Sequence, residues 1–238
     1  MKRAVVTGST KGIGKAIGIK LLENGYFVFF NYGHNEQSAR DLEIELKNFS
    51  NNFKIIKNDF SSEKNIDEFC LNVSEKNIDV LVLNVGITDR TAWNEMTMEQ
   101  WNHVLYTNLT APAFLSQKLG GKMNNGGSIL FIGSVLGEYP HSLSLPYGIT
   151  KNAVHYLAKS LVKEYYEKNI TVNAIATGFT DTQWQKSKPE EVRNRIMSKI
   201  AQKRFAEAEE IASLANEILN NKYINGSVVS INGGYDFL

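Results

Sequence analysis

Short apolar segments alternate with longer amphipathic segments along almost the whole chain. Helical patterns, with apolar residues three and four positions apart, separate most of the strand-like runs. Strands joined through helices pair in parallel, because each crossover helix lies on a face of the sheet. The pattern therefore predicts an α/β fold, a doubly wound parallel sheet of about seven strands with helices on both faces. The strand-like runs are residues 3–7, 26–31, 53–57, 78–83, 127–133, 170–175 and 227–231.

One domain can hold all of these elements. The chain has 238 residues, and no Pro-rich or Gly/Ser-rich linker divides it, so we expect a single domain over residues 1–238. Residues 183–203 are polar and charged with little strand character, which indicates a lid-like segment rather than a core element. The 26 basic and 25 acidic side chains leave a net charge of +1. This balance favours neither nucleic acid nor a membrane surface as a partner.

Cysteine and histidine usage bears on compartment and metals. A single cysteine, Cys70, excludes an internal disulfide and falls at an apolar position of a helical pattern, so we expect it in the core of a cytoplasmic protein. No secretory leader is recognisable, and no apolar run approaches the ~20 residues of a membrane span. The histidines show no spacing that would gather a metal ion, so no metal site is predicted. They are His34, His103, His141 and His155.

The first strand-like run leads directly into a glycine-rich turn and then into a helical pattern. Glycines let the backbone approach a pyrophosphate closely, and the helix N-terminus supplies free N–H donors and a positive dipole end. The order strand, turn, helix therefore predicts a dinucleotide site, with a purely structural turn as the alternative. The spacing is G-x-x-x-G-x-G rather than G-x-G-x-x-G or a Walker loop. The turn consists of Gly8, Ser9, Thr10, Lys11, Gly12, Ile13 and Gly14.

The second strand-like run ends without a carboxylate. It closes on Asn31 and Tyr32, and the first acidic residue is Glu36. In NAD enzymes an acidic residue at this strand end holds the ribose 2′-hydroxyl, and it would repel a 2′-phosphate. Lys11 in the glycine turn is placed to pair with such a phosphate. These features favour NADP over NAD, unless Lys11 is only a solvated loop charge.

Polar or glycine residues also follow the next three strand-like runs. Asp59 follows the third, where it could cap a helix or accept a bond from the adenine amino group. Asn84 and Gly86 follow the fourth, and Ser134 follows the fifth. Parallel strands end at one edge of the sheet, and ligands bind at that edge. We therefore expect these residues to surround one cleft.

Tyr147 and Lys151 open the helical pattern that follows Ser134. Residues four apart lie on the same face of a helix, and an ammonium group favours the phenolate. A phenol pKa of ~10 could then move toward neutrality, as a general acid or base requires. The alternative without catalysis is a half-buried tyrosine beside a solvated lysine. Asn108 interrupts the helical pattern of residues 97–118, and a buried asparagine there must bond a kinked backbone, a water or a ligand.

Taken together, these segments resemble the short-chain dehydrogenase/reductase family over essentially the whole chain. The resemblance implies a single-domain Rossmann-type fold and an NAD(P)H-dependent oxidoreductase acting on a CH–OH/C=O group. The matching segments are TGSTKGIG at 7–14, the Asp59 turn, NVG at 84–86, Asn108, Ser134, YGITK at 147–151 and TGFTDT at 177–182.

The resemblance also implies roles for individual residues. Tyr147 would protonate the carbonyl oxygen, Ser134 would donate a hydrogen bond to it, and Lys151 would lower the Tyr147 pKa and bind the nicotinamide ribose. Asn108 would hold a water that links Lys151 to solvent. The implied cofactor residues are Gly8, Ser9, Thr10, Lys11, Gly12, Ile13, Gly14, Asn31, Tyr32, Asp59, Phe60, Asn84, Val85, Gly86, Tyr147, Lys151, Gly178, Thr180 and Thr182.

Within the family, the chain is most similar to 3-oxoacyl-acyl-carrier-protein reductases of fatty acid synthesis. This likeness implies NADPH, a thioester substrate, a homotetramer, and a carrier protein docked on lysines near the cleft mouth. The chain departs from the family pattern at Leu83, Val85 and Thr177, where Asn, Ala and Pro are usual, which leaves the substrate open. The alternatives are a sugar, polyol or secondary-alcohol dehydrogenase, and a nucleotide-binding module without turnover. The docking candidates are Lys118, Lys122, Lys163 and Lys168.

Overall fold

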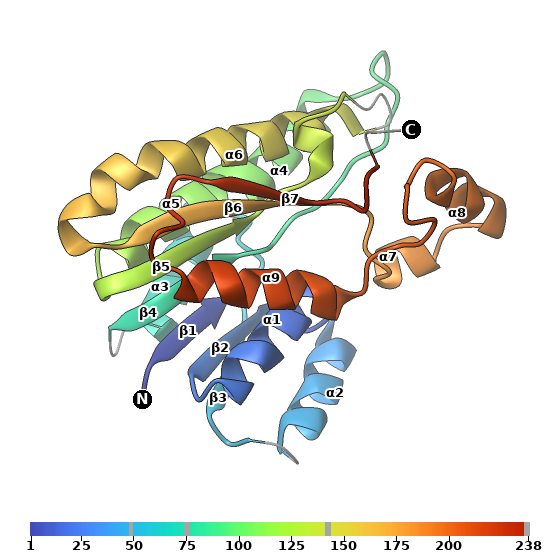
Figure 1. The fold of residues 1–238 in the computed structure, drawn as a ribbon. Helices are drawn as coiled ribbons and strands as arrows, with labels where there is room; N and C mark the ends of the chain where they lie inside the picture. Colours follow the sequence, from blue (N-terminus) through green and yellow to red (C-terminus); the bar gives the residue numbers. More distant parts are fainter. Residues whose placement is uncertain (48–49, 74–76, 141–143, 236–238) are drawn as a thin grey trace.

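The computed structural model describes all residues except 48–49, 74–76, 141–143 and 236–238 (Figure 1). Its centre is one seven-stranded sheet with the order β3-β2-β1-β4-β5-β6-β7. Every neighbouring pair is parallel, so the predicted doubly wound sheet is confirmed. The strand order reverses between β1 and β4, and sheets of this kind bind ligands at the carboxyl ends of the strands beside such a reversal. The strands are β1 Arg3–Val6, β2 Phe27–Tyr32, β3 Phe53–Lys57, β4 Ile78–Leu83, β5 Met123–Ile132, β6 Thr171–Thr177 and β7 Val228–Ile231.

Helices cover both faces of the sheet and divide the core into two layers. On one face lie α1 (Gly12–Glu23), α2 (Glu36–Lys47) and α9 (Ala208–Asn220). On the other lie α3 (Glu63–Val73), α5 (Ala111–Gly120) and α6 (Leu145–Tyr165). The described residues also form the shorter α-helices α4 (Met98–Leu105), α7 (Gln183–Lys186) and α8 (Glu190–Met197), and 3-10 helices over Val135–Gly137 and Tyr166–Lys168.

Strand side chains alternate between these two layers. Ala4 and Val6 of β1 face the α1 and α9 side, whereas Val5 faces the α3 and α6 side. A strand buried on both faces needs apolar residues in succession, which explains the continuous apolar runs in the sequence. Cys70 lies in the core as expected, and burial raises the pKa of its thiol to about 11.

The helix expected over residues 97–118 is divided by a π-helical turn, Tyr106–Thr110. Pro112 has no N–H group, so it cannot bond the carbonyl of Asn108 as an α-helix requires. The chain widens instead, and the N–H of Ala111 donates to the carbonyl of Tyr106, five residues back. Asn108 lies within this turn, and its side chain is buried.

The segment 183–203 lies beyond the carboxyl edge of the sheet, where Figure 1 shows α7 and α8 standing apart from the main layers. No residue of α7 or α8, both fully described, is buried. That this segment closes as a lid stays a prediction. Among the described residues, no helix is long and apolar enough to span a membrane.

Candidate active site

The glycine turn connects β1 to α1 at the carboxyl edge. Gly8 and Gly12 adopt left-handed backbone angles, with φ of 59° and 56°. A Cβ on Gly14 would lie 2.6 Å from both the Gly8 carbonyl oxygen and the Asn84 amide nitrogen. Asn84 donates to the carbonyls of Thr7 and Gly8, so it fastens the turn to β4. The turn is therefore packed closely against Asn84, and Gly14 leaves no room for a side chain.

The N-terminus of α1 offers hydrogen-bond donors. Lys11 is the N-cap residue, and its described side chain makes no capping bond, so the first N–H groups of the helix face outward. These donors, on a turn whose glycines carry no side chain, fit the pyrophosphate of a dinucleotide. Ser9 and Asn31 are fully buried and bond to each other, and Asn31 also accepts from the Gly8 N–H. They shape the turn from beneath.

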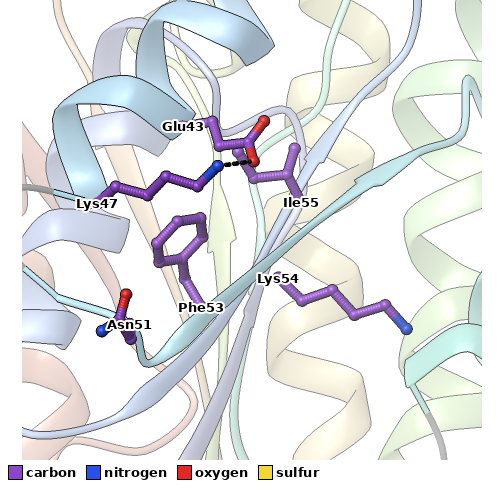
Figure 2. Close-up of a pocket in the computed structure, with 6 residues that line it drawn as sticks. All are labelled: Glu43, Lys47, Asn51, Phe53, Lys54 and Ile55. Atoms are coloured by element: carbon purple, nitrogen blue, oxygen red, sulfur yellow. Dashed lines mark ion pairs between the residues drawn. The ribbon is translucent and has the colours of Figure 1, made fainter.

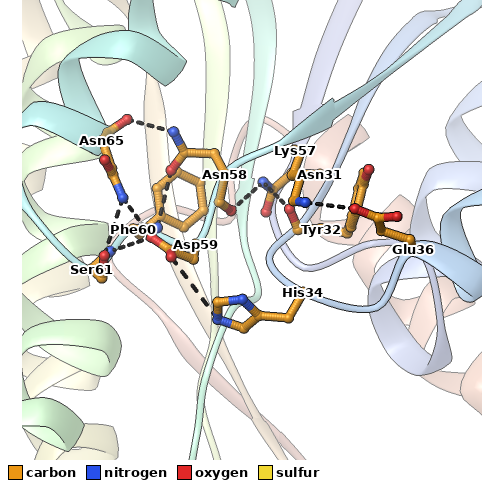
Figure 3. A network of polar contacts seen from close by, with 10 residues as sticks. All are labelled: Asn31, Tyr32, His34, Glu36, Lys57, Asn58, Asp59, Phe60, Ser61 and Asn65. Carbon is orange, nitrogen blue, oxygen red and sulfur yellow. Dashed lines mark hydrogen bonds and ion pairs between the residues drawn. The ribbon is translucent and has the colours of Figure 1, made fainter.

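Figure 3 shows a polar network at the adjoining ends of β2 and β3. Asp59 accepts bonds from the Ser61 N–H at 2.9 Å and the Asn65 amide at 2.6 Å. Burial opposes ionisation of Asp59, but the bonds from Ser61 and Asn65 prevail and lower its pKa. Asp59 thus fastens the turn before α3, whereas the cap on the first turn of that helix is Ser62, whose hydroxyl oxygen accepts from the Asn65 N–H at 3.2 Å. That Asp59 accepts a bond from the adenine amino group stays a prediction. Phe60 has φ of 54° and a fully buried ring, so only its main chain could reach a ligand.

Charges near the end of β2 are unevenly neutralised. Glu36, the first carboxylate after β2, forms an ion pair with Lys57 at 2.6 Å. Lys11 is exposed and forms no ion pair with any described carboxylate. Tyr32 is the last residue of β2. Thr10 of the glycine turn and Ser38 of α2 share a hydrogen bond of 2.9 Å between their hydroxyl oxygens.

Tyr147 and Lys151 lie in the first two turns of α6, which begins with proline near its first position as helices often do. Tyr147 is hydrogen-bonded to Ser134. Burial raises the pKa of Tyr147, and the Ser134 bond opposes that rise. The pKa of Tyr147 is thus raised rather than lowered here. That Lys151 lowers it during the reaction stays a prediction.

Lys151 is nearly inaccessible, with 4% of its surface exposed. Its ammonium donates to the Ile132 carbonyl at 2.7 Å and lies 5.6 Å from the Tyr147 ring centroid. Burial lowers the pKa of Lys151 to about 8. An ammonium with this pKa can give up its proton near neutral pH, so Lys151 is suited to proton exchange beside Tyr147.

The side chain of Asn108 forms hydrogen bonds with the backbone of Ile87. Its side-chain oxygen accepts from the Ile87 N–H and its amide donates to the Ile87 carbonyl, both at 2.8 Å. The amide also reaches Thr150 of α6 at 3.2 Å. A Cβ on Gly86 would lie 3.4 Å from the Lys151 ammonium nitrogen and 3.6 Å from the Asn108 oxygen. The structure thus brings Gly86, Asn108 and Lys151 together.

The turn after β6 approaches the same cleft. Gly178 donates to Ile231, and a Cβ there would lie 2.6 Å from the Asn232 backbone. Thr182 lies over the glycine turn, since its methyl carbon is 3.0 Å from where a Cβ of Gly12 would be. Thr180 is buried and bonds the Gly178 carbonyl. Val85 covers Gly8 in a similar way, and Ile13 is half-buried beside it.

The sequence analysis missed two residues of the site. Trp184 of α7 packs against Tyr147, and His155 of α6 accepts a bond from the Ser134 N–H. An aromatic residue isolated in the polar segment 183–203 was a usable signal for Trp184. Nothing in the sequence pattern distinguished His155.

The predicted docking lysines do not lie at the cleft mouth. Helices α5 and α6 start at the carboxyl edge of the sheet and end near the starts of β5 and β6, so their last turns lie at the opposite edge. Lys118 and Lys163 are in those last turns, and Lys122 and Lys168 directly precede β5 and β6. The expectation is wrong. Lys118 is also paired with Asp67 at 2.7 Å.

Two further features lie outside the site. The hollow in Figure 2 is between α2 and the outer strand β3. It is lined by Glu43, Lys47, Asn51, Phe53, Lys54 and Ile55. In the described part of the chain no group of three or more His, Cys, Asp or Glu side chains could hold a metal ion, and His141 lies outside it.

The fold and the glycine turn after β1 together indicate a class of protein, the dinucleotide-binding oxidoreductases. A family model described as short chain dehydrogenase matches residues 2–193. The chain belongs to the short-chain dehydrogenase/reductase family, whose members bind NAD(P) and act on keto or hydroxyl groups.

Several relatives match over nearly their full length. The chain is 34% identical over 241 residues to an acetoacetyl-CoA reductase from Rhizobium meliloti, with 98% of each chain covered. It is 30% identical over 239 residues to the 3-oxoacyl-[acyl-carrier-protein] reductase FabG of Staphylococcus epidermidis, again with 98% of each covered. A solved Burkholderia cenocepacia short chain dehydrogenase in complex with NADP has a TM-score of 0.93 at 25% identity, covering 99% of this chain and 98% of that one.

Proposed function

We propose that this protein catalyses the NADPH-dependent reduction of a 3-oxoacyl thioester to the 3-hydroxyacyl form, as in fatty acid synthesis. The placement of the Ser134 hydroxyl beside the phenol of Tyr147 and near the buried Lys151 carries the proposal, because two hydroxyl groups that can each donate a hydrogen bond then stand side by side. Two of the similar proteins are named as reductases of acetoacetyl-CoA and of 3-oxoacyl-[acyl-carrier-protein]. Carbonyl reduction on such a thioester needs the donors that these side chains supply.

Each side chain has one task in this reaction. NADPH, when bound, supplies the hydride. The raised pKa of Tyr147 keeps its phenol protonated near neutral pH, so the phenol can give its proton to the carbonyl oxygen. Ser134 donates a hydrogen bond to that oxygen as negative charge develops. Lys151 binds the nicotinamide ribose and resupplies the proton. Asn108 holds a water that links Lys151 to solvent, and its bonds keep the loop at Ile87 against α6.

The choice of NADPH rests on charge. Lys11 is exposed beside the glycine turn without an ion-pair partner in the described residues, and Glu36 is neutralised by Lys57. A 2′-phosphate at this place could therefore pair with the ammonium of Lys11, while the carboxylate of Glu36 is already paired with Lys57. The cofactor residues named from the sequence keep their proposed roles. Those whose polar groups are buried, Ser9 and Asn31, would act by shaping the turn.

Exposed apolar side chains on α5 and α6 support a homotetramer assembled through these helices. Phe114 and Ile149 are each 44% exposed, and Tyr156 is 73% exposed. Burying such side chains against a second copy would stabilise the assembly. Sedimentation velocity would test it, and a monomer at micromolar concentration would contradict it. A cytoplasmic location remains part of the proposal.

A sugar or polyol dehydrogenase is the second candidate. A putative gluconate dehydrogenase of Agrobacterium tumefaciens has a TM-score of 0.92 at 26% identity, covering 100% of this chain and 97% of that one. This reaction would use the same Tyr147, Ser134 and Lys151. The two candidates therefore differ in substrate rather than in catalytic residues.

A substrate panel separates them. The protein is mixed with NADPH or NADH and acetoacetyl thioesters of coenzyme A and of acyl carrier protein, and loss of the reduced-nicotinamide absorbance is followed. In parallel, sugars, sugar acids and polyols are offered with the oxidised cofactors. We expect thioester reduction with a preference for NADPH. Turnover of the polyols or sugar acids alone would replace the proposal with the second candidate.

A further inference from the structure

The end of β5 is held from several sides at the peptide that carries Ser134. The Gly133 carbonyl accepts from the Thr177 hydroxyl at 3.2 Å. The Ser134 N–H donates to the imidazole Nε2 of His155 at 3.4 Å. Two side chains, one from the end of β6 and one from α6, therefore bond the two polar groups of this single peptide.

His155 suits the acceptor role because it is buried and uncharged. Only 6% of its surface is exposed, and burial, with the cations Lys151 and Lys159 adding to it, lowers its pKa to about 4. An imidazole must be neutral at Nε2 to accept an N–H. A Cβ on Gly133 would overlap this nitrogen, so glycine is required for the imidazole to approach the strand.

Thr177 supplies the second bond from a buried position, with 7% of its surface exposed. The neighbouring groups are fixed as well, because the Gly133 N–H donates to Ile175 at 2.7 Å and the Ile132 carbonyl accepts from Lys151 at 2.7 Å.

The Ser134 side chain is oriented in turn. Its oxygen accepts from the Leu136 N–H at 3.2 Å, so the hydroxyl hydrogen remains available for another acceptor. A shift of the Gly133–Ser134 peptide would move this oxygen relative to Tyr147. A displacement of about 1 Å in a reacting group can cost on the order of 100-fold in rate.

We propose that His155 and Thr177 are positioning residues that hold the Gly133–Ser134 peptide, and thereby the Ser134 hydroxyl, in register with Tyr147. The proposal rests on the proposed function in one respect, namely that Ser134 acts on the substrate carbonyl. It assigns the pair no contact with substrate.

The test removes each bond while keeping side-chain size. The variants are Thr177→Val, His155→Leu and His155→Gln, and the amide oxygen of the last can accept from the Ser134 N–H. His155→Leu and Thr177→Val should each lower kcat about tenfold, with KM for the thioester and Kd for NADPH changed less than about twofold. His155→Gln should restore most of kcat. Ser160→Ala, at an exposed position of the same helix, is the control and should leave kcat unchanged.

A double-mutant cycle that combines His155→Leu with Ser134→Ala distinguishes a positioning effect on Ser134 from a general loss of packing. In the Ser134→Ala background, His155→Leu should lower kcat no further, because the group being positioned is gone. An equal tenfold loss in both backgrounds would overturn the proposal, as would His155→Gln behaving like His155→Leu.

Hydrogen exchange of the Ser134 amide reads the bond without turnover. We expect protection in the wild type and in His155→Gln, and exchange at least about tenfold faster in His155→Leu. Unchanged exchange in His155→Leu would overturn the proposal. If no carbonyl or alcohol in the panel is turned over, the proposed function fails and the catalytic part of this inference fails with it, whereas the exchange result still decides whether His155 holds the peptide.

Discussion

The indole of Trp184 packs edge-on against the phenol ring of Tyr147, with ring centroids 6.0 Å apart. Trp184 belongs to α7, the first element of the segment 183–203. The segment that we expect to act as a lid therefore contacts the proposed acid directly. This contact also removes water from one side of the phenol and so contributes to its raised pKa.

Replacing Trp184 by Ala should expose Tyr147 on that side. We expect kcat/KM for the carbonyl substrate to fall about tenfold, because solvent would weaken the hydrogen bonds made in the cleft, with little change in Kd for NADPH. Tyr223→Ala is the control, since Tyr223 is fully exposed. Steady-state kinetics and a fluorescence titration measure the two quantities, and an unchanged kcat/KM would show that the contact is incidental.

Gly14→Ala should disrupt the glycine turn. Its Cβ would lie 2.6 Å from the Gly8 carbonyl oxygen, and forced contacts of this kind cost about 1–3 kcal/mol. We expect a corresponding drop in the free energy of unfolding in urea and weaker NADPH binding. Gly121→Ala is the matched control, because Gly121 has helical φ of −59° and its nearest neighbour would be 3.5 Å from a Cβ. Equal stabilities of the two variants would refute the close approach.

Asn108→Ala should destabilise the π-helical turn and the loop at Ile87. It would leave the N–H and carbonyl of Ile87 without their side-chain partners, at about 1–3 kcal/mol for each buried group left unsatisfied. Urea unfolding measures the loss. Asn102→Ala, at an exposed position of α4, should change stability by less than about 0.5 kcal/mol. A similarly small effect for Asn108→Ala would contradict the observed bonds.

The buried ammonium of Lys151 predicts how stability varies with pH. Its pKa falls from 10.5 to about 8 on folding, so between these values the unfolded chain binds more protons than the folded one. Stability should therefore rise with pH across this window, and the cost of the buried charge should be fully present below pH 8. Between pH 7 and 9.5 the free energy of unfolding of the wild type should rise by about 2 kcal/mol relative to that of Lys151→Met. A difference independent of pH would rule out the lowered pKa.

Sequence reasoning recovered the sheet because each buried strand is a continuous apolar run and each helix is periodic. It also placed Ser134, Tyr147 and Lys151 at one edge, because parallel strands share a direction. The same reasoning should have excluded the docking lysines. Helices that run antiparallel to the strands carry the last turns of α5 and α6 to the other edge.

The remaining differences between the site expected from the sequence and the site in the structure come from contacts between residues that are far apart in the sequence. Burial raises the pKa of Tyr147 against the effect of Ser134, 13 positions before it, and the ring that packs on the phenol is that of Trp184, 37 positions after it. The π-helical turn had a local signal in Pro112, but the partner of Asn108 is a loop 21 positions earlier. His155 has no periodic signature, because its role arises only where α6 meets the end of β5.

Tyr147→Phe tests the central claim most directly. The variant removes only the phenolic hydroxyl, so turnover of the 3-oxoacyl thioester should fall by about 1,000-fold, within the range for loss of a general acid. Kd for NADPH, measured by titration on the same preparation, should stay within about twofold of the wild type. Turnover retained at the wild-type level with tight NADPH binding would contradict the assignment of Tyr147 as the proton donor.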